Sequence, residues 1–403
     1  MKKILQINVV ANWGSTGKIT ENIGKFAMAQ GWESHIAYGR GEPVSASKLL
    51  RVGNDVDMYT HVMQSMLLDN HGLASKHATQ KFIEDVKRIN PDVIHLHNIH
   101  GYYLNYELFF EYLATLDIPV LWTFHDCWSM TGHCSHFDAI GCNKWQSECY
   151  DCPLKGEYPA SLLLDASKRN FRLKKKLFTS VKNMTIVSVS RWLADIVGHS
   201  YMAKYPIRVI NNGVDTEVFK PRESALRAKH GLENKFVLLG VASTWNEMKG
   251  FDDFICLASQ LPDDYRILLI GLTRKQIEKL PSNIIGIERT ENQIQLAEYY
   301  SIADVFVIPT YNDSFPTVNM EALASGTPVV TYKTGGSPEI ISDETGLVVE
   351  KGDVAGLKMA IETIKNNGKQ YYSAACRERA LKCFNKDDRF REYVDLYDEL
   401  MHK

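Results

Sequence analysis

The chain has 403 residues, a length for which two domains are expected rather than one hydrophobic core. Hydrophobic residues make up 45% and charged residues 23%, which is ordinary for a globular protein. The formal net charge of −2 excludes a general electrostatic attraction to nucleic acid or membrane, and no apolar run approaches the length of a membrane span.

Strand and helix patterns alternate along the chain, which predicts an α/β protein with parallel sheets. The expected strands of the first half are 4–10, 34–38, 93–97, 120–125, 185–188 and 208–210, with helices such as 78–89 and 104–115 between them. Turn residues at 211–215 interrupt this series, and a second one begins at 236–241 and continues through 349. A last helix, 387–401, carries apolar residues at helical spacing.

The first ten residues have a strand-like pattern. Gln6 and Asn8 interrupt the apolar run, and no small-residue cleavage site follows, so a first strand is favoured over a signal peptide. Eight cysteines without an export signal suggest thiols or metal ligands rather than disulfides. We therefore expect a cytoplasmic protein, with a peripheral position at the inner face of the membrane left open.

A glycine-containing loop, 13–18, follows the first expected strand. It superficially suggests a P-loop, but Asn12 stands where the first glycine should be and Ile19 where Ser or Thr should hold Mg²⁺. A tight turn between strand and helix explains Gly14 and Gly17 about as well as a ligand does.

Histidines gather at the ends of two expected strands. His95, His97 and His100 end one of them, and His125-Asp126 ends another. A lone histidine at a strand end is more often structural than functional. Ligands nevertheless bind at the carboxyl ends of parallel strands, so His125 is a candidate ligand-binding residue.

Four cysteines follow in one segment: Cys134, Cys142, Cys149 and Cys152. The spacing of the last two is typical of a metal-binding knuckle, whereas the wider spacing of the first two is not. With Cys127 and His133 as extra candidate ligands, we expect one structural zinc, whose four protein ligands would leave no position open for chemistry. Buried free thiols remain the alternative.

The segment 168–178 is rich in cations. Phe171, Leu177 and Phe178 interleave with six Lys and Arg residues, as in a basic amphipathic helix that lies on anionic lipid. A solvated helix face explains the same pattern and is favoured.

The segment 309–336 reads as part of one βαβ unit. The apolar run 305–308 predicts a buried strand, and the helix that starts near Thr317 ends at Gly326. A second strand, 329–331, leads to Gly335-Gly336.

Two acids flank the start of that helix. Asp313 lies in the strand-to-helix loop and Glu321 in the first turns of the helix. Free backbone N–H groups and the helix dipole favour an anion such as phosphate at this place. An ordinary helix start with acidic residues is the simpler explanation of the acids alone.

The stretch from Asp313 to Val329 resembles the signature of the retaining, nucleotide-sugar-dependent glycosyltransferases of family 4. That signature is an acid, seven residues and Glu-Ala-x-Ala-x-Gly-x-Pro-Val; the first acid is more often Glu, and here it is Asp. The segment 212–221 also resembles the family, at the linker between its two domains. The resemblance covers nearly the whole chain and implies the GT-B fold, two Rossmann-like domains with parallel sheets facing across a cleft.

The resemblance also implies a separate role for each domain. The acceptor-side domain would be 1–211 and the nucleotide-sugar-binding domain 212–384, with a C-terminal helix, 385–403, that packs back on the first. The implied activity is that of a hexosyltransferase-type enzyme, which moves a sugar from a UDP- or GDP-sugar to a glycan or lipid-linked acceptor in surface polysaccharide biosynthesis. Configuration would be retained, no cofactor would be needed for catalysis, and no nucleic acid would be bound. Peripheral membrane contact through 168–178 stays open.

Four residues receive catalytic roles from the resemblance. Lys249 would stabilise the leaving diphosphate, and Glu321 would hold the ribose hydroxyls. Asp313 and His125 would hold the donor sugar and the positive charge that develops on it. The other donor-binding positions are Gly14, Gly17, Ser243, Arg274, Arg289, Thr290, Phe315, Pro316, Thr317 and Val318.

The chain departs from the family in the diphosphate clamp. Lys249 precedes Gly250 as in the family, but Ser243 stands where relatives carry Arg. Either Lys249 works with backbone N–H groups, or another cation such as Arg274 substitutes. Two other functions remain open: an epimerase of sugar nucleotides on the same architecture, which needs no acceptor, and a non-catalytic module that binds sugar nucleotides or glycans without turnover.

Overall fold

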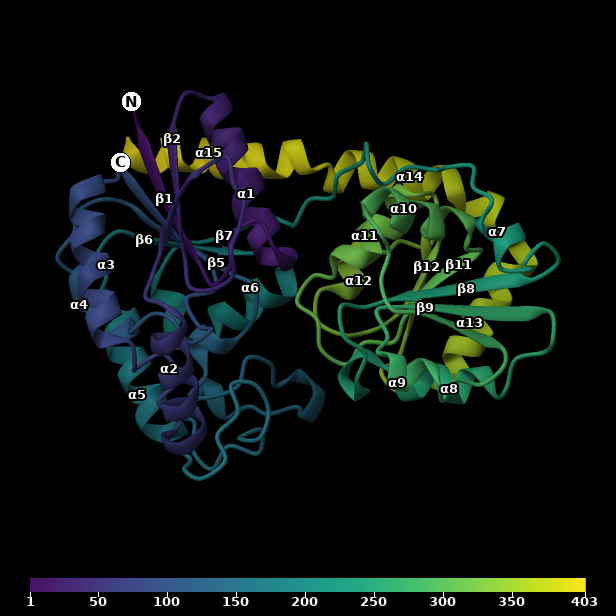
Figure 1. Ribbon diagram of the computed structural model, residues 1–403, viewed down its shortest axis with the longest axis horizontal. Helices are drawn as coiled ribbons and strands as arrows, with labels where there is room; N and C mark the ends of the chain where they lie inside the picture. Colours follow the sequence, from purple (N-terminus) through teal and green to yellow (C-terminus); the bar gives the residue numbers. More distant parts are fainter. Residues whose placement is uncertain (403) are drawn as a thin grey trace. The chain divides into compact units, whose positions relative to one another are not determined.

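The computed structural model describes residues 1–402 and divides into two compact units (Figure 1). Unit 1 contains Met1–Asn211 and the residues from Arg389 onward, and unit 2 contains Asn212–Asp388. Each unit is built on its own parallel sheet, of seven strands in unit 1 and six in unit 2. No helix within residues 1–402 is long and apolar enough to cross a bilayer.

The sheet of unit 1 has the order β3-β2-β1-β4-β5-β6-β7. Its strands are β1 (Lys3–Asn8), β2 (Glu33–Tyr38), β3 (Lys48–Arg51), β4 (Val93–Leu96), β5 (Val120–Phe124), β6 (Met184–Ser188) and β7 (Ile207–Val209). The six strands expected from the sequence are confirmed. β3 was missed because its four residues lie at the sheet edge, where none is buried and no apolar run marks the strand.

Helices cover both faces of this sheet. They are α1 (Gly14–Ala29), α2 (Asp55–Leu68), α3 (Lys76–Ile89), α4 (Tyr106–Leu113), α5 (Ser167–Phe178), α6 (Arg191–Gly198) and the part of α15 (Lys386–Met401) that belongs to unit 1. One core joins α1 and α15 to the sheet, with Ile4, Ile23 and Tyr397 fully buried. Tyr397 also lies 2.6 Å from His95 Nδ1, which ties α15 to β4.

Unit 2 repeats the architecture with the order β10-β9-β8-β11-β12-β13. Its strands are β8 (Phe236–Val241), β9 (Tyr265–Ile270), β10 (Ile284–Ile287), β11 (Val305–Ile308), β12 (Val329–Tyr332) and β13 (Gly346–Val349). Its helices are α7 (Leu226–Lys229), α8 (Phe251–Ala258), α9 (Arg274–Ile277), α10 (Gln293–Ile302), α11 (Thr317–Ala324), α12 (Ser337–Ile340), α13 (Val354–Asn367) and α14 (Lys369–Phe384). In Figure 1, α8 and α13 cover one face of the sheet, and α10, α11 and α14 cover the other.

Both sheets reverse their strand order beside their first strand. In unit 1 the chain leaves β1 on one side for β2 and β3, then returns to place β4 on the other side. In unit 2 the same reversal sets β11 beside β8. Ligands of open parallel sheets bind outside the carboxyl ends of the strands at such a point, so the loops that follow these four strands are where a site is expected.

The long connection between β5 and α5 carries the four cysteines of the expected zinc site. Together with His133 they line one cavity of about 20 Å³, and all eight cysteines of the chain are free thiols. A hydrogen bond with Cys134 lowers the pKa of Cys152 to about 7. Within residues 1–402, however, no group of three or more His, Cys, Asp or Glu side chains is arranged to hold a metal ion. The four cysteines line one cavity, but their sulfur atoms are not arranged as the ligands of a metal ion.

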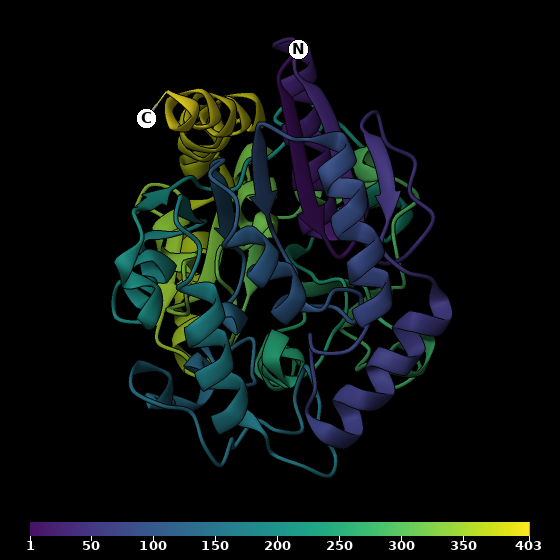
Figure 2. The same ribbon diagram turned by 90° about the vertical axis from the view of Figure 1, so that its left-hand side faces the viewer.

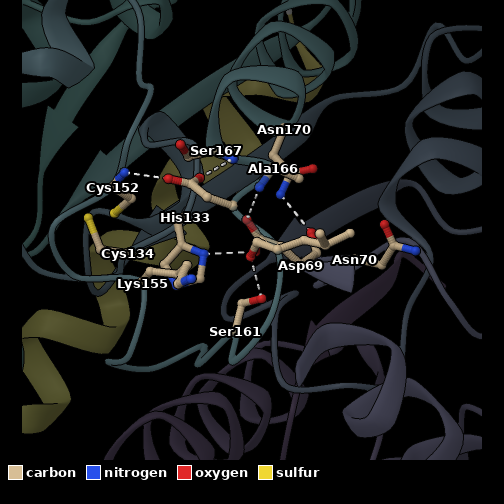
Figure 3. Close-up of polar contacts among 12 residues, drawn as sticks. Asp69, Asn70, His133, Cys134, Cys152, Lys155, Ser161, Ala166, Ser167 and Asn170 are labelled. Atoms are coloured by element: carbon tan, nitrogen blue, oxygen red, sulfur yellow. Dashed lines mark hydrogen bonds and ion pairs between the residues drawn. The ribbon is translucent and has the colours of Figure 1, made fainter. Parts of the chain in front are cut away.

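Two acids, the buried Asp69 and the exposed Asp165, make the polar contacts that order this connection (Figure 3). Asp69 Oδ1 lies 2.7 Å from His133 Nδ1, and Asp69 Oδ2 accepts from the Ala166 amide at 2.8 Å. Asp165 accepts from the amides of Cys152 and Ser167, at 2.6 and 2.8 Å. Asp69 directly follows α2, so the end of that helix fixes both ends of the cysteine segment.

The basic segment forms α5, but its apolar residues are not available to lipid. Phe171, Leu177 and Phe178 are buried, and Phe178 packs with Phe110 at 4.4 Å between ring centroids. Lys174 is buried as well. The solvated-face explanation therefore describes this helix, with its other five cations exposed: Lys168, Arg169, Arg172, Lys175 and Lys176.

Lys174 has a structural role that its sequence context did not indicate. Its Nζ donates to the carbonyl oxygens of Trp128 and Thr131 at 2.8 and 3.2 Å, and it lies 3.4 Å from the Trp128 ring centroid. Burial lowers the pKa of Lys174 to about 7. The side chain thus holds the start of the cysteine segment against α5.

We predict that Lys174→Met destabilises the protein by about 1–3 kcal/mol, because it leaves two buried carbonyl groups without their donor. Lys175→Met, on the exposed face of the same helix, should stay within about 0.5 kcal/mol of the wild type. Urea unfolding measures both variants. Equal stability of the two variants would contradict a structural role for Lys174.

The zinc prediction is tested by elemental analysis of protein purified without chelator. The expectation from the sequence requires about one zinc per chain, with Cys149→Ser losing the metal and lowering Tm. Cys256→Ser, which changes an exposed thiol of α8, is the matched control. Wild-type protein that is free of metal and as stable as protein supplied with zinc would show that the segment holds buried thiols only.

Candidate functional site

The centre of the candidate site is an ion pair at the carboxyl ends of β8 and β11. Lys249, in the loop after β8, donates from Nζ to Asp313 Oδ2 at 2.8 Å, and Asp313 lies in the loop after β11. The same Nζ donates to the Asn312 carbonyl at 3.2 Å. The side chains of Lys249 and Asp313 keep 32% and 22% of their surface exposed, so a ligand can reach both. The structure therefore brings together two residues that the sequence placed 64 positions apart.

Two glycines with positive φ let the backbone come close enough to build this pair. Gly250, at φ 71°, follows Lys249, and a Cβ added there would lie 2.2 Å from the Pro309 carbonyl oxygen. Gly335, at φ 52°, packs on Asp313 so closely that an added Cβ would lie 1.7 Å from its carbonyl oxygen. Only glycine satisfies both the backbone angle and the approach. The loop after β12 is thereby held against the loop after β11.

The start of α11 lies in the same loop system and presents free backbone N–H groups. Pro316 is the N-cap and makes no side-chain cap, and Thr317 and Val318 are the half-buried first residues of the helix. The first N–H groups of a helix have no partner within it, and the helix dipole adds positive potential. The anion site that the sequence predicts at this terminus would use these N–H groups.

Glu321 lies one turn further along α11 and is half-buried. Its Oε2 accepts from the Tyr300 hydroxyl at 3.0 Å. Burial and the neighbouring carboxylate raise the pKa of Tyr300 well above its usual value, so this hydroxyl stays protonated and remains a donor. Tyr300 therefore fixes the orientation of the Glu321 carboxylate.

The sequence did not reveal a set of buried polar groups around this point. Both amide atoms of Asn319 and the hydroxyl oxygens of Ser314, Thr334 and Ser337 are buried and have no hydrogen-bond partner in the protein. Buried polar groups without partners are rare and unfavourable, and a bound ligand is one way in which they gain partners. Ser314, Thr334 and Ser337 lie next to Asp313 and Gly335 in the sequence, and this proximity was the only indication that the sequence offered. Their burial, which the sequence does not show, distinguishes them from ordinary loop residues.

The remaining donor-side positions lie in other loops of unit 2. Ser243 is exposed after β8, and Arg289 and Thr290 follow β10. Arg274 opens α9, and its Nε donates to Glu288 at 2.8 Å. The structure thus places Arg274 and Lys249 in separate ion pairs.

Phe315 differs from the other predicted donor contacts, because its side chain belongs to the core. The residue is buried, and its ring lies 5.9 Å from that of Phe384 between centroids. Its carbonyl oxygen accepts from Asn212 at 3.2 Å. The ring of Phe315 therefore packs in the core under the loop and is not available to a ligand.

In unit 1 the glycine loop leads directly into α1. Gly17 is packed, since an added Cβ would lie 3.1 Å from Val10, and its carbonyl accepts from the Asn12 amide at 3.0 Å. The turn explanation is therefore sufficient for Gly17. Gly14, at φ 62°, has no atom within 4 Å on its Cβ side, so it presents open backbone.

The histidines of β4 and β5 form a connected set. His97 Nδ1 lies 3.1 Å from His125 Nε2, and His97 Nε2 lies 3.3 Å from Gln6 Oε1. His95 and His97 are fully buried, whereas His125 is half-buried. Burial lowers the pKa of His125 to about 4, so the imidazole is neutral near pH 7. His125 can exchange hydrogen bonds with a sugar without adding positive charge.

The neighbouring Asp126 is a structural acid. Its Oδ2 lies 2.8 Å from His100 Nε2, and its Oδ1 accepts from the Trp128 amide at 2.9 Å. Burial alone would raise the pKa of Asp126, but the charge and hydrogen bond of His100, aided by His136 and the amide, lower it overall. Asp126 thus holds the loop that carries His125.

Two family models together match most of the chain. Residues 16–218 match the family described as Glycosyltransferase Family 4, and residues 222–382 match Glycosyl transferases group 1. WcaC of Escherichia coli K12, provisionally assigned as a colanic acid biosynthesis glycosyl transferase, is 24% identical over 98% of this chain and 100% of its own length. A D-inositol 3-phosphate glycosyltransferase of Mycobacterium sp. strain KMS is 30% identical, over 43% of each chain.

Solved structures share the fold over the whole chain. Sucrose-phosphate synthase of Thermosynechococcus elongatus superposes with a TM-score of 0.74 at 19% identity and covers 100% of both chains. HepE of Anabaena, solved with UDP-glucose, gives 0.67 at 16% identity and covers 99% of this chain and 100% of its own. WaaG, a glycosyltransferase of lipopolysaccharide biosynthesis, gives 0.64 at 14% identity over 98% of this chain and 99% of its own. The two family matches and the two parallel α/β sheets lead to one conclusion: the chain belongs to glycosyltransferase family 4 and has the GT-B fold.

Proposed function

We propose that this glycosyltransferase transfers a sugar, with retention of configuration, from a nucleoside diphosphate sugar bound by unit 2. The observation that carries the proposal is the Lys249–Asp313 pair beside the uncapped start of α11. A diphosphate has the charge and the acceptor oxygens that this cation and these N–H groups favour. UDP-sugars are the first donors to test, because HepE was solved with UDP and with UDP-glucose.

The donor would rearrange the ion pair. Without donor, Lys249 is held by Asp313 and the Asn312 carbonyl. The diphosphate would compete for Lys249, and Asp313 would then lie free beside the sugar. As the bond to the leaving diphosphate breaks, negative charge grows near Lys249 and α11, and positive charge grows on the sugar near Asp313. Protein groups supply this stabilisation, so we expect no requirement for a metal ion.

Other residues would complete donor recognition. Glu321, oriented by Tyr300, would accept from the ribose hydroxyls. Asn319 and Ser314 would gain partners from donor atoms, which would remove the cost of leaving them unpaired. His125 would contact the transferred sugar as a neutral imidazole.

For the acceptor we propose a glycan or a lipid-linked glycan of surface polysaccharide biosynthesis, bound by unit 1 on the cytoplasmic side. The support is the similarity to WcaC, which extends over 98% of this chain. A strict acceptor requirement for turnover of the donor distinguishes this function from epimerisation.

We predict that Glu321→Gln weakens UDP affinity and kcat/KM together, each by about tenfold, because charge-assisted hydrogen bonds are roughly twice as strong as neutral ones. A ribose contact acts in the ground state and in the transition state alike. Titration calorimetry with UDP and an initial-rate assay measure the two effects. Glu344→Gln, an exposed position of unit 2, should leave both unchanged. Unaltered UDP affinity in folded Glu321→Gln would remove the ribose role.

We predict that Lys249→Ala lowers the transfer rate at least tenfold, because a charge-assisted contact to phosphate contributes about 1.5–3 kcal/mol. Arg274→Ala should have a small effect, since Arg274 is exposed and paired with Glu288. Lys229→Ala, at an exposed position away from these loops, is the control. If Arg274→Ala is inactive and Lys249→Ala is not, the diphosphate is bound at α9 and the proposed centre is wrong.

A further inference from the structure

Lys249 is held by more than its ion pair with Asp313. A lysine ammonium group has three protons to donate, and three acceptors lie near this one. They are Asp313 Oδ2 at 2.8 Å, the Asn312 carbonyl at 3.2 Å and Thr310 Oγ1 at 3.5 Å from Nζ. Asp313 is the charged acceptor of the three, and the other two are neutral oxygens of the same loop.

Thr310 is a completely buried polar residue between the two loops that carry the ion pair. It lies shortly after the end of β11. Its hydroxyl oxygen is 3.0 Å from the Asn312 carbonyl and 3.2 Å from the Met248 carbonyl. The Met248 carbonyl already accepts from the Tyr311 amide at 2.9 Å, so the nearer Asn312 carbonyl is the better acceptor for the single hydroxyl proton.

The Thr310 hydroxyl therefore acts on Lys249 in two ways. Its oxygen accepts from Nζ, and its proton goes to the Asn312 carbonyl, which is the other neutral acceptor of the same Nζ. A carbonyl oxygen has two lone pairs, so the Asn312 oxygen can accept from both donors. Thr310, Asn312 and Lys249 thus form a closed triangle of polar contacts.

The backbone of Lys249 is fixed independently of Thr310. Its amide donates to Asn246 Oδ1 at 3.1 Å, and Gly250 with its positive φ follows it. A lysine carries its charge at the end of a flexible stem, so a fixed backbone alone does not set the direction of the ammonium group. That direction is important in this chain, because Ser243 stands where relatives carry a second cation.

We propose that Thr310 is a positioning residue, which directs Lys249 at the donor diphosphate by fixing the two neutral acceptors of its ammonium group. The inference rests on the proposed function, in which the diphosphate displaces Asp313 from Lys249. During that exchange Thr310 and the Asn312 carbonyl keep their contacts, so the remaining N–H points to the place that the Asp313 carboxylate has left. A charge that is oriented beforehand needs no reorganisation when the phosphate arrives. Thr310 does not touch the donor and acts through Lys249.

A purely structural threonine would behave differently. Thr310 also ties the loop after β11 to the loop after β8 through the Met248 carbonyl, and loss of that contact lowers stability whether or not Lys249 is present. The positioning role predicts in addition that the effect of Thr310 on ligand binding disappears once Lys249 has been removed. Substitutions of two residues that act through one another are not additive, and a double-mutant cycle measures the difference.

The test is such a cycle on the affinity of the full chain for UDP, measured by titration calorimetry. Thr310→Val keeps the shape of the side chain and removes the hydroxyl. We expect it to weaken UDP binding at least about fivefold, because hydrogen bonds to charged groups are the strong ones. In the Lys249→Ala background the same substitution should change UDP affinity by less than about twofold. Thr310→Ser keeps the hydroxyl and should stay within about twofold of the wild type.

Two controls separate positioning from a general loss of stability. Thr345→Val removes a buried hydroxyl that donates to the Ser342 carbonyl at 3.1 Å, directly before β13 in the same unit. Thr79→Val removes a buried hydroxyl of α3 that accepts from the Asn105 amide at 2.8 Å, in unit 1, which faces the viewer in Figure 2. Both controls should lower Tm, as Thr310→Val does, and leave UDP affinity unchanged.

The outcomes distinguish this inference from the proposed function on which it rests. If Lys249→Ala binds UDP as the wild type does, both are wrong. If Lys249→Ala weakens UDP binding and Thr310→Val does not, the positioning role alone is overturned. The same holds if Thr310→Val weakens UDP binding equally with and without Lys249, or if Thr310→Ser is as weak as Thr310→Val. Thr310→Ala gives the same comparison if Thr310→Val does not fold.

Discussion

The ion pair between Lys249 and Asp313 is the interaction on which the candidate site depends. A parallel sheet brings the carboxyl ends of all its strands to one edge, and the reversal of strand order sets β8 beside β11 at that edge. A cation after one strand and an acid after the other therefore meet, although 64 positions separate them. The fold creates the meeting point, and the loop residues give it chemical character.

The close packing of the loops makes this pair a defined site. Gly250 and Gly335 allow backbone to approach carbonyl oxygens where any side chain would collide, and the uncapped start of α11 lies in the same loop system. Unpaired polar atoms at Asn319 and Ser314 indicate that the protein keeps hydrogen-bonding capacity there at some expense of stability. In unit 1, by contrast, the buried His97 bridges Gln6 and His125, and the half-buried His125 is neutral near pH 7.

The sequence predicted six of the seven strands of unit 1 and the two-series organisation, because apolar runs are local signals. It also singled out Asp313 and Glu321 as candidates from their spacing. It did not predict which side chains the tertiary structure encloses. The sequence around Lys174 is that of an exposed lysine in a basic helix. The side chain is buried because it packs against Trp128, 46 positions earlier, and donates to the Trp128 carbonyl. Phe315 was expected at the donor and lies in the core, because the packing of its ring against Phe384 is set by the tertiary structure.

A crystal structure of the protein with UDP would show whether Lys249 and the start of α11 bind the diphosphate. We expect the diphosphate at the first turn of α11, with Lys249 Nζ within hydrogen-bonding distance of a phosphate oxygen and the 2.8 Å contact to Asp313 lengthened or opened. We also expect Glu321 to accept from the ribose hydroxyls. A diphosphate bound elsewhere, with the Lys249–Asp313 pair intact, would contradict this role of the ion pair.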